Sequence, residues 1–348
     1  MRPPANDLRQ ILTAGVQAPS AENRHALVFV MREEDVELTA TDSASWTVLP
    51  HRAMLALLAC GAVIENMALR SAEMGYAMQA DILPEPSRPA LIARLHWQRA
   101  GARDALSDQI EARHTNRRLF RSTRVAPEIL DRLQRAGRAV TGADLLWLNA
   151  RSTRSLALHA IRIAETERFK RARLHEEIFS AVRFDAGWSE PAAEGLAPAT
   201  LEIEAPMRPL FAALRRWPTM RRANYFGAHL ALGFRAGYLP CISAPHLGLI
   251  VGRDGARGNL DAGRAMQRIW LAATAEGLSL QPMAAATALA LQVPGDGWVA
   301  SATRKVLAES LVRLTGTSGA QPYLLFRLGY SRPSSAVSGR QPVHVYVM

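Results

Sequence analysis

The chain has 348 residues, of which 49% are hydrophobic and 21% charged, so its composition is that of a globular protein rather than a disordered one. No apolar run follows the basic start, and the longest run, Ala53–Ile64, is too short to span a bilayer, so we expect no signal peptide and no membrane partner. The net charge of +11 comes almost entirely from arginine, since Lys170 and Lys305 are the two lysines among 42 basic residues, and no nucleic-acid motif accompanies it.

The first hundred residues predict a helix followed by four strands around a second helix. Asp7 is a candidate cap for a helix whose apolar residues follow helical spacing up to Val16, and that helix ends near Pro19. The next elements are two strands, a long helix that is apolar nearly all round, and two more strands: Leu27–Met31, Val36–Ala40, about His51–Met74, Tyr76–Leu83 and Leu91–Gln98. A helix without a polar face is expected to be buried.

The rest of the chain begins with a polar connector, Ala100–Ser107, and contains a long irregular part. Regular elements are predicted on both sides of it: Ala126–Gly137, Ala143–Leu148, Ser152–Arg171, Ala262–Glu276, Trp298–Leu314 and Tyr323–Tyr330. Between them, residues 173–258 are rich in Pro, Gly and Trp, with weak periodicity. A stretch of that kind is typical of a lid or a binding excursion.

A weak internal repeat relates the two long apolar helices. Gly61-Ala-Val-Ile-Glu-Asn-Met-Ala-Leu69 aligns with Gly263-Arg-Ala-Met-Gln-Arg-Ile-Trp-Leu271 at an offset of 202 residues, and both copies run through a glycine into a strand-like segment. The repeat predicts a duplicated unit whose two halves pair within one chain. The ligand site is then expected at their interface.

Three short motifs carry candidate binding chemistry. Arg113-His-Thr-Asn-Arg-Arg118 combines charged donors with a hydroxyl, as a phosphate monoester requires, although a solvated basic loop would have the same composition. Ala18-Pro-Ser-Ala-Glu-Asn-Arg24 supplies a rigid turn with a hydroxyl and an amide, and Gly277-Leu-Ser-Leu-Gln-Pro-Met283 runs from a helix end toward a proline. An ordinary helix-stop loop and a plain helix C-cap are the alternatives for these two. No metal site is expected, because His175-Glu-Glu177 lacks a second histidine at metal spacing.

Taken together, the motifs resemble those of the nitroreductase superfamily of FMN proteins, in particular its tandem Acg-type branch. The residues that match its FMN-binding segments are Arg113, His114, Thr115 and Arg117; Pro19, Ser20 and Asn23; Gln281, Pro282, Met283 and Ala284; and Arg340. The sequence departs from the family after the Pro-Ser turn, where it reads Asn23-Arg-His-Ala-Leu27. The first 17 residues also contain no Arg-His-Ser-like segment, which predicts one flavin site rather than two.

The resemblance implies an α+β fold of two nitroreductase-like halves, each mainly an antiparallel sheet flanked by helices, fused as an intrachain pseudo-dimer. We expect a degenerate N-terminal half at 1–105 and a C-terminal half at 106–348, with the lid-like excursion at about 173–258. The chain would then be a monomer with an internal pseudo-dimer, or a homodimer of it. Cys60 and Cys241 lie in apolar segments, as reduced thiols of a cytoplasmic protein do.

The implied activity is ping-pong hydride transfer from NADH or NADPH through FMN to a small electron acceptor, a nitroaromatic or a quinone. The flavin carries the chemistry, so no catalytic side chain is expected. The alternative is an FMN-binding protein for sequestration or sensing, in which a closed lid prevents turnover.

Overall fold

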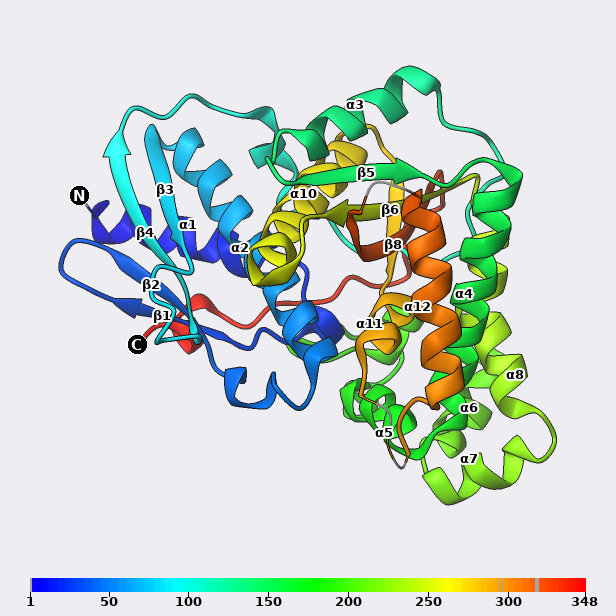
Figure 1. Ribbon diagram of the computed structural model, residues 1–348. Helices are drawn as coiled ribbons and strands as arrows, with labels where there is room; N and C mark the ends of the chain where they lie inside the picture. The colour runs from blue at the N-terminus through cyan, green and yellow to red at the C-terminus, as the bar shows by residue number, and fades with distance from the viewer. Residues whose placement is uncertain (1, 294, 296, 317–318) are drawn as a thin grey trace.

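The computed structural model describes residues 2–293, 295, 297–316 and 319–348. Two four-stranded antiparallel sheets stand side by side, with helices packed between and around them (Figure 1). The expected α+β class, with two antiparallel sheets flanked by helices, is therefore confirmed.

The first sheet is built from the first hundred residues. After α1 (Ala5–Val16) come β1 (Leu27–Met31), β2 (Val36–Ala40), α2 (Pro50–Glu73), β3 (Tyr76–Ile82) and β4 (Leu91–Arg99), and the strands lie in the order β1-β2-β4-β3. These elements match the predicted ones closely. The cap of α1 differs, because Pro4 occupies that position and the Asp7 carboxylate instead accepts a hydrogen bond from the Tyr76 hydroxyl at 2.7 Å.

The second sheet repeats this connectivity. α3 (Pro127–Arg138), β5 (Ala143–Trp147), β6 (His246–Gly252), α10 (Gly255–Ala275), β7 (Ser279–Met283) and β8 (Gln321–Gly329) follow in sequence, and the strands lie in the order β5-β6-β8-β7. Each sheet thus takes the same path, two strands, a long helix and two strands. The shared path supports the repeat read from Gly61 and Gly263.

The second half is longer because two connections carry insertions. Residues 148–245, between β5 and β6, hold α4 (Arg151–Lys170), α5 (Ala172–Ala181), α6 (Arg208–Leu214), α7 (Trp217–Asn224), α8 (Ala228–Gly233), the π-helical segment η7 (Phe234–Tyr238) and α9 (Leu239–Ser243). Residues 284–320, between β7 and β8, include α11 (Ala285–Leu291) and α12 (Ser301–Thr315). In the first half the corresponding connections are short turns.

These boundaries correct the expected excursion at 173–258. The stretch is largely helical, and its last part belongs to the core, because β6 is buried along its whole length between β5 and β8. An uninterrupted apolar strand such as His246–Gly252 lacks the alternation by which half-exposed strands are recognised. The β5–β6 connection is therefore the larger excursion, and α10 begins earlier than the predicted helix.

The two halves meet where α2 crosses α10, and the crossing is reciprocal. A Cβ on Gly61 would lie 2.2 Å from the Leu260 carbonyl oxygen, and one on Gly263 would lie 2.1 Å from the Leu58 carbonyl oxygen. Leu58 and Leu260 are themselves 202 residues apart. In a two-fold interface, a contact between residue i of one half and residue j of the other recurs between the equivalent of j and the equivalent of i. The two glycine contacts follow this rule. One continuous apolar core runs through this crossing and joins both sheets.

Polar contacts beside the crossing break its symmetry. The buried Glu65 carboxylate accepts hydrogen bonds from Arg264 Nε at 2.9 Å and Arg268 Nη1 at 2.8 Å. The buried amide of Gln267 donates to Asn66 Oδ1 at 2.6 Å. At the equivalent positions the repeat has Gln267 for Glu65 and Asn66 for Arg268, so these charges occur in one orientation only.

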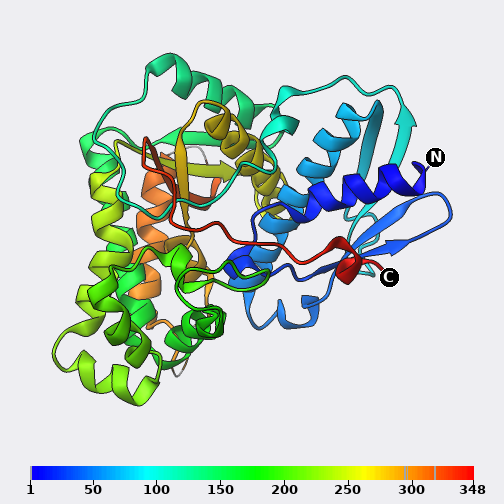
Figure 2. The same ribbon diagram turned by 180° about the vertical axis from the view of Figure 1, so that it is seen from behind.

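The C-terminal segment crosses from the second half to the first (Figure 2). After β8 the chain runs past both sheets, and Val347 pairs with Phe29 at the free edge of β1. Met348 N donates to Phe29 O at 2.9 Å, and Met31 N donates to Met348 O at 3.0 Å. This arm covers an edge that would otherwise expose unpaired backbone groups.

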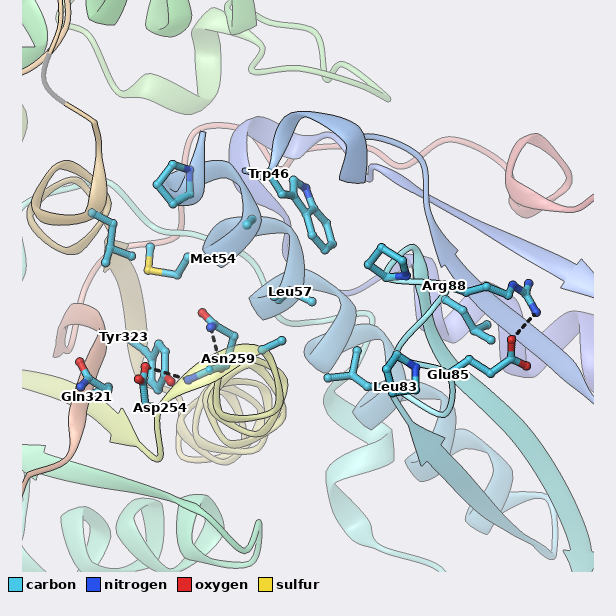
Figure 3. Close-up of a pocket in the computed structure, with 18 of the residues that line it drawn as sticks. Trp46, Met54, Leu57, Leu83, Glu85, Arg88, Asp254, Asn259, Gln321 and Tyr323 are labelled. Atoms are coloured by element: carbon cyan, nitrogen blue, oxygen red, sulfur yellow. Dashed lines mark hydrogen bonds and ion pairs between the residues drawn. The ribbon is translucent and has the colours of Figure 1, made fainter. Parts of the chain in front are cut away.

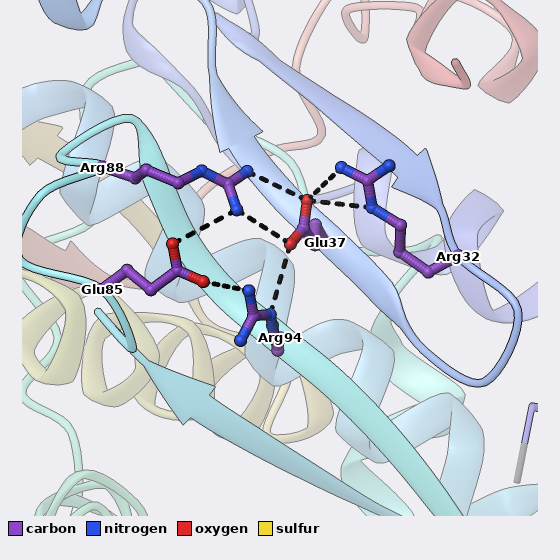
Figure 4. Close-up of polar contacts among 5 residues, drawn as sticks. All are labelled: Arg32, Glu37, Glu85, Arg88 and Arg94. Atoms are coloured by element: carbon purple, nitrogen blue, oxygen red, sulfur yellow. Dashed lines mark hydrogen bonds and ion pairs between the residues drawn. The ribbon is translucent and has the colours of Figure 1, made fainter.

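An ion-pair network lies on the first sheet (Figure 4). The Glu37 carboxylate, which is buried, accepts hydrogen bonds from Arg32 at 2.7 Å, from Arg88 at 3.1 Å and from Arg94 at 3.2 Å. Arg88 and Arg94 also contact Glu85. These arginines lower the pKa of Glu37 to about 2.

Burial accounts for the apolar composition of α2 and for the two cysteines. Among the described helices, α2 is the one long and apolar enough by composition to cross a membrane, yet 72% of its most apolar window is buried inside the protein. Cys60 and Cys241 are buried free thiols, and burial raises the pKa of each to about 12.

Candidate functional site

The Arg113–Arg118 motif runs along the outer edge of the second sheet. Thr115 forms a parallel bridge to Leu280 in β7, and Asn116 N donates to Leu280 O at 3.3 Å. The motif therefore lies next to Gln281, the first of the predicted residues in β7. Two segments that are some 165 residues apart in the chain are brought together here.

Two arginines from different segments converge on the end of α1. Arg113 Nη2 donates to the Gln17 carbonyl oxygen at 3.0 Å, and Arg340 Nη2 donates to the same oxygen at 3.4 Å. Arg340 also donates to the Ala18 carbonyl at 3.2 Å and to Asn23 Oδ1 at 2.5 Å. The predicted Arg113, Arg340 and Asn23 thus occupy one place, at the junction of the two halves.

Neither of these guanidinium groups has a carboxylate partner in the part of the chain that the structure describes. Burial, and for Arg113 also the nearby Arg340, lowers the pKa of Arg113 to about 9 and that of Arg340 to about 10. The Nε atoms of both are buried without a hydrogen-bond partner. A buried cation and a half-buried one, with unused buried donors and no counter-charge, favour binding of an anion.

The Pro-Ser turn places further polar groups beside this pair. The hydroxyl of Ser20 is buried without a partner, next to Pro19. Asn23 adopts a left-handed conformation with φ of 57°, which turns its amide toward the second half, where it donates to Gly339 O at 3.2 Å. The structure therefore brings the turn from the first half to the arginines of the second.

Arg117 lies further along the motif, where the β5–β6 connection reaches it. Its Nη1 donates to the Thr200 carbonyl oxygen at 3.1 Å, and burial lowers its pKa to about 10. Part of its surface remains accessible. Arg117 thus adds a third cation on the same side of the motif as the excursion.

Other predicted residues use their side chains within the protein. Gln281 Oε1 accepts a hydrogen bond from the buried Arg327 at 2.7 Å, and Met283 packs into the apolar core of the second half. His114 Nδ1 lies 2.9 Å from the Ala112 carbonyl oxygen. Pro282 is paired in β7, and Ala284 precedes α11. At Gln281–Ala284, contact with a ligand would therefore fall mainly to the backbone.

Two residues of this region were not singled out from the sequence. The Trp270 ring lies 4.5 Å from the Arg113 guanidinium carbon, in a cation–π contact that fixes the arginine. His25 Nε2 contacts the Val16 carbonyl at 3.1 Å, its Nδ1 is unpartnered, and burial together with Arg340 lowers its pKa to about 4. Trp270 falls inside the repeat at a position where the first copy has Ala68, which is a usable signal.

The β5–β6 connection covers the Pro-Ser turn. Gly195 N donates to the Asn23 carbonyl oxygen at 3.2 Å, and Asn23 Nδ2 lies 3.4 Å from the Ala192 and Ala193 carbonyls. Arg24 adds an ion pair with Glu194 at 3.5 Å. The excursion is thus held to the first half, close to the paired arginines, by one backbone hydrogen bond, by the Asn23 side chain and by an ion pair.

A cleft of about 630 Å³ lies elsewhere, and none of the twelve predicted residues lines it (Figure 3). It opens between the first turns of α2 and α10 and involves Met54 and Leu57 together with Ala256 and Asn259. Those pairs are equivalent in the repeat, so the cleft sits on the pseudo-two-fold axis. It lacks buried unpaired cations, and we place the candidate site at Arg113 and Arg340. No cluster of metal ligands occurs among the residues described.

This architecture defines a class: an α+β chain of two similarly connected sheets with an arginine-rich site at their junction. No family model matches the chain. It is 27% identical over 350 residues to the uncharacterized protein MT1398 of Mycobacterium tuberculosis, a match covering 96% of this chain and 47% of that protein. The chain therefore spans about half the length of this curated relative.

Solved structures that resemble the chain include flavoproteins. The FMN-dependent nitroreductase NfnB of Mycobacterium smegmatis is 16% identical with a TM-score of 0.36, over 68% of this chain and 90% of that one. An FMN-bound nitroreductase of Bacteroides fragilis is 11% identical with a TM-score of 0.35, over 68% and 94%. Because these TM-scores are low, the proposals below rest on residues of this chain.

Proposed function

We propose that the chain binds one FMN at the junction of its halves and belongs among nitroreductase-like, Acg-type flavoproteins. The observation that carries the proposal is the pair formed by the buried Arg113 and the half-buried Arg340, which share an acceptor and have buried, unused Nε donors but no carboxylate. A phosphate monoester supplies the missing negative charge and accepts several hydrogen bonds at once. The unpartnered Ser20 hydroxyl provides a neutral donor beside them.

FMN, when bound, would supply hydride acceptance and donation, for which the chain itself has no substitute. The residues of the chain would bind and orient it. Arg113 and Arg340 hold the phosphate end, the backbone of Gln281–Ala284 borders the ring, and Arg117 supplies positive charge to its polar edge. The excursion around Thr200 would exclude water from this region.

The proposed activity is transfer of a hydride from NADH or NADPH to a small electron acceptor, a nitroaromatic or a quinone, in separate half-reactions. The family resemblance and the single arginine-rich site support it. The proposal includes a two-domain division near residue 105, a monomer with an internal pseudo-dimer or a homodimer, a cytoplasmic location, and no nucleic-acid partner.

A second candidate, sequestration or sensing of FMN without turnover, is favoured by one specific observation. The excursion is hydrogen-bonded to Asn23 and Arg117, which are two of the residues proposed to hold the flavin. A hydride donor and an electron acceptor both need access to the flavin ring. The contacts of the excursion with Asn23 and Arg117 block one route to that ring. The two candidate functions differ in whether the β5–β6 connection moves away from the proposed flavin site.

The first test is the flavin content of the purified chain, measured from its absorbance after reconstitution with FMN. One FMN per chain is expected, and two would contradict a single site. Arg113→Ala is expected to weaken FMN binding by about 30-fold or more, from loss of a charge-assisted contact. Arg113→Lys should recover part of that loss, because it keeps the charge but not the planar fork.

The matched control for this series is Arg9→Ala, which removes an exposed arginine on α1. It should bind FMN as the wild type does. Thermal unfolding without flavin shows whether Arg113→Ala is folded, and Arg340→Gln provides an independent variant of the same pair. Folded variants of both arginines with unchanged FMN affinity would mean that the phosphate lies elsewhere.

Stopped-flow mixing with NADH and NADPH separates turnover from sequestration. An oxidoreductase is expected to lose flavin absorbance with at least one donor and to recover it with a quinone or a nitroaromatic. Flavin that stays oxidised with both donors but is reduced by dithionite would instead support sequestration.

A further inference from the structure

The part of the β5–β6 connection farthest from the first sheet forms an outer corner of the molecule, built by α6, α7 and α8 (Figure 1). Its inner side is a small apolar core of its own, which contains Phe169, Phe179, Leu214 and Met220. The corner is therefore a packed structure and not a loose loop. Nothing in the proposed flavin chemistry uses its outer side.

The helical segment from 228 to 243 has two apolar faces. Ala228, Leu232 and Ala236, spaced by four residues, pack against the inner core. At Gly233 a Cβ would lie 2.6 Å from the Thr166 hydroxyl oxygen, so this side is pressed onto α4. Residues two positions away from that stripe point to the opposite side of a helix.

The opposite stripe is apolar and exposed. On the helix it consists of Leu230 and Phe234, four residues apart, with Ile242 further along the segment, and the exposed Phe226 lies in the turn just before the helix. Phe226 and the preceding Tyr225 stand at the α7–α8 turn, with 93% and 85% of their surface exposed. Single exposed apolar residues are normal, but an exposed stripe that begins at two adjacent aromatic residues indicates an interaction surface.

The exposed charges next to the aromatic pair are positive, and Arg235, further along the segment, is paired with Glu204 at 2.6 Å. Residues 205–244 contain six arginines and no aspartate or glutamate. Arg221 and Arg222 precede the aromatic pair, and both are exposed. Within the described chain, neither has a hydrogen-bond or ion-pair partner for its side chain. Near His229 on α8, α4 contributes both the positive Lys170 and the negative Glu167.

We propose that this surface, made of Arg221, Arg222, Tyr225, Phe226, Leu230 and Phe234 and called here the corner surface, docks onto a bilayer that contains anionic lipids. Aromatic and aliphatic side chains flanked by arginines, along a helix, are the combination that lies in a membrane interface. The aromatic residues enter the boundary of the acyl chains, and the arginines contact the anionic headgroups.

The charges of the corner surface favour an anionic bilayer over a second copy of the chain, and its apolar side chains favour a bilayer over a nucleic acid. A second copy of the corner surface would bring arginine against arginine, with no acid in 205–244 to pair with them. A nucleic acid would pair with the arginines but would leave Leu230 and Phe234 exposed to solvent. An anionic bilayer satisfies the charged and the apolar parts together. The proposal is independent of flavin binding, because the corner surface shares no residue with the candidate site.

Co-sedimentation of the full chain with lipid vesicles tests the proposal. Binding is expected to phosphatidylcholine vesicles that contain phosphatidylglycerol, to be weak with phosphatidylcholine alone, and to fall as salt is raised. Arg221→Ala/Arg222→Ala should weaken the binding by about 30-fold, and Tyr225→Ser/Phe226→Ser by at least about tenfold. Phe226→Trp should show a blue shift of its emission with anionic vesicles only.

Matched controls change the same kinds of residue elsewhere. Arg304→Ala/Arg313→Ala removes two exposed arginines of α12, and Val48→Ser/Val312→Ser removes two exposed apolar side chains. Both controls should bind vesicles as the wild type does. Equal losses in controls and corner variants would overturn the proposal, and so would absence of binding to anionic vesicles.

Two further measurements distinguish the other occupants. Sedimentation velocity without lipid would overturn the proposal if the chain self-associates and Tyr225→Ser/Phe226→Ser abolishes this. Fluorescence anisotropy with duplex DNA would overturn it if the arginine pair governs DNA binding while vesicle binding is unaffected. A monomer with no DNA binding of that kind supports the lipid surface.

Discussion

Arg113 and Arg340 share one acceptor, the Gln17 carbonyl oxygen, and neither has an acidic partner among the described residues. The chain contains more than twenty described ion pairs, and nearly all of them match an arginine with a glutamate or an aspartate. Arg113 and Arg340, one buried and one half-buried, differ from these ion pairs because their guanidinium groups share a carbonyl oxygen and keep unused donors. An external anion bound there would supply the missing counter-charge.

Glu37 shows the opposite arrangement and gives a prediction about pH. Its folded-state pKa of about 2 lies below the ordinary value of 4.5, so the charged carboxylate stabilises the fold above about pH 4.5. This contribution is lost as the pH falls toward 2. Glu37→Gln is expected to lower the free energy of unfolding at pH 7 by roughly 2 kcal/mol, reduced by the exposure of its arginine partners.

The measurement is urea unfolding of wild type and Glu37→Gln from pH 7 to pH 2.5. The difference in the free energy of unfolding should shrink steadily below pH 4.5. Glu34→Gln, which changes an exposed glutamate on the same turn, should follow the wild type throughout. A difference independent of pH would mean that the ion pairs are not its source.

At the level of single residues, the sequence predicted which types of residue form the site better than it predicted the contacts of their side chains. The types of residue in the Arg113 motif suit a phosphate, the family resemblance added Arg340 and Asn23 to the same site, and the structure brings these three together. The roles of Trp270 and His25 could not be predicted, because each depends on a neighbour distant in the chain. The hydrogen bond from Arg327 to the Gln281 side chain could not be predicted for the same reason.

Among the elements, the α2–α10 crossing is the most constrained. The crossing requires glycine because the backbone of the partner helix occupies the space of a side chain. Gly61→Ala is expected to lower the free energy of unfolding by at least about 2 kcal/mol, although alanine favours a helix. Gly263→Ala should act similarly, since it occupies the equivalent position.

Gly15→Ala is the matched control, because the added methyl group there would meet the flexible side chain of Met67 at 2.8 Å. Its effect should stay within about 1 kcal/mol. Chemical denaturation of the three variants compares them directly. Equal losses in the free energy of unfolding for Gly15→Ala and Gly61→Ala would mean that α2 and α10 can move apart at their crossing without loss of stability.

The local elements were predictable to the extent that periodicity marks them. The amphipathic α1 and the short strands of the first sheet follow their predicted bounds closely. Strand β6 was missed because a strand buried on both faces has no alternation, and its two neighbours, β5 and β8, lie far away in the sequence. Insertions between β5 and β6 hid their pairing from any local pattern.

For the whole molecule, the continuous core across both sheets predicts that neither half is stable alone. Cutting the chain between Ala102 and Arg103, both exposed, would leave α2 and α10 on separate fragments. We expect co-expressed fragments 1–102 and 103–348 to co-purify in equal amounts and to bind FMN. Fragment 1–102 expressed alone should aggregate, because the apolar face of α2 would lie open.

Size-exclusion chromatography and circular dichroism of the fragments test this prediction. Mixed fragments that fail to associate, or a soluble and cooperatively folded fragment 1–102, would show that the halves are independent domains. The same experiment tests the division near residue 105, which the connectivity of the sheets supports.

The ion pairs of Glu65 with Arg264 and Arg268 have a consequence for assembly during synthesis. In a pair of identical subunits every contact occurs twice, so nothing distinguishes one partner from the other. Here α2 carries the acid and α10 carries both bases. Two α2 helices from neighbouring nascent chains would place Glu65 against Ala62 and Asn66, and two α10 helices would place Gln267 against Arg264 and Arg268, so neither pairing would form these ion pairs. The charge asymmetry therefore directs each first half to a second half, and the second half most available to it is the one still being made on the same ribosome.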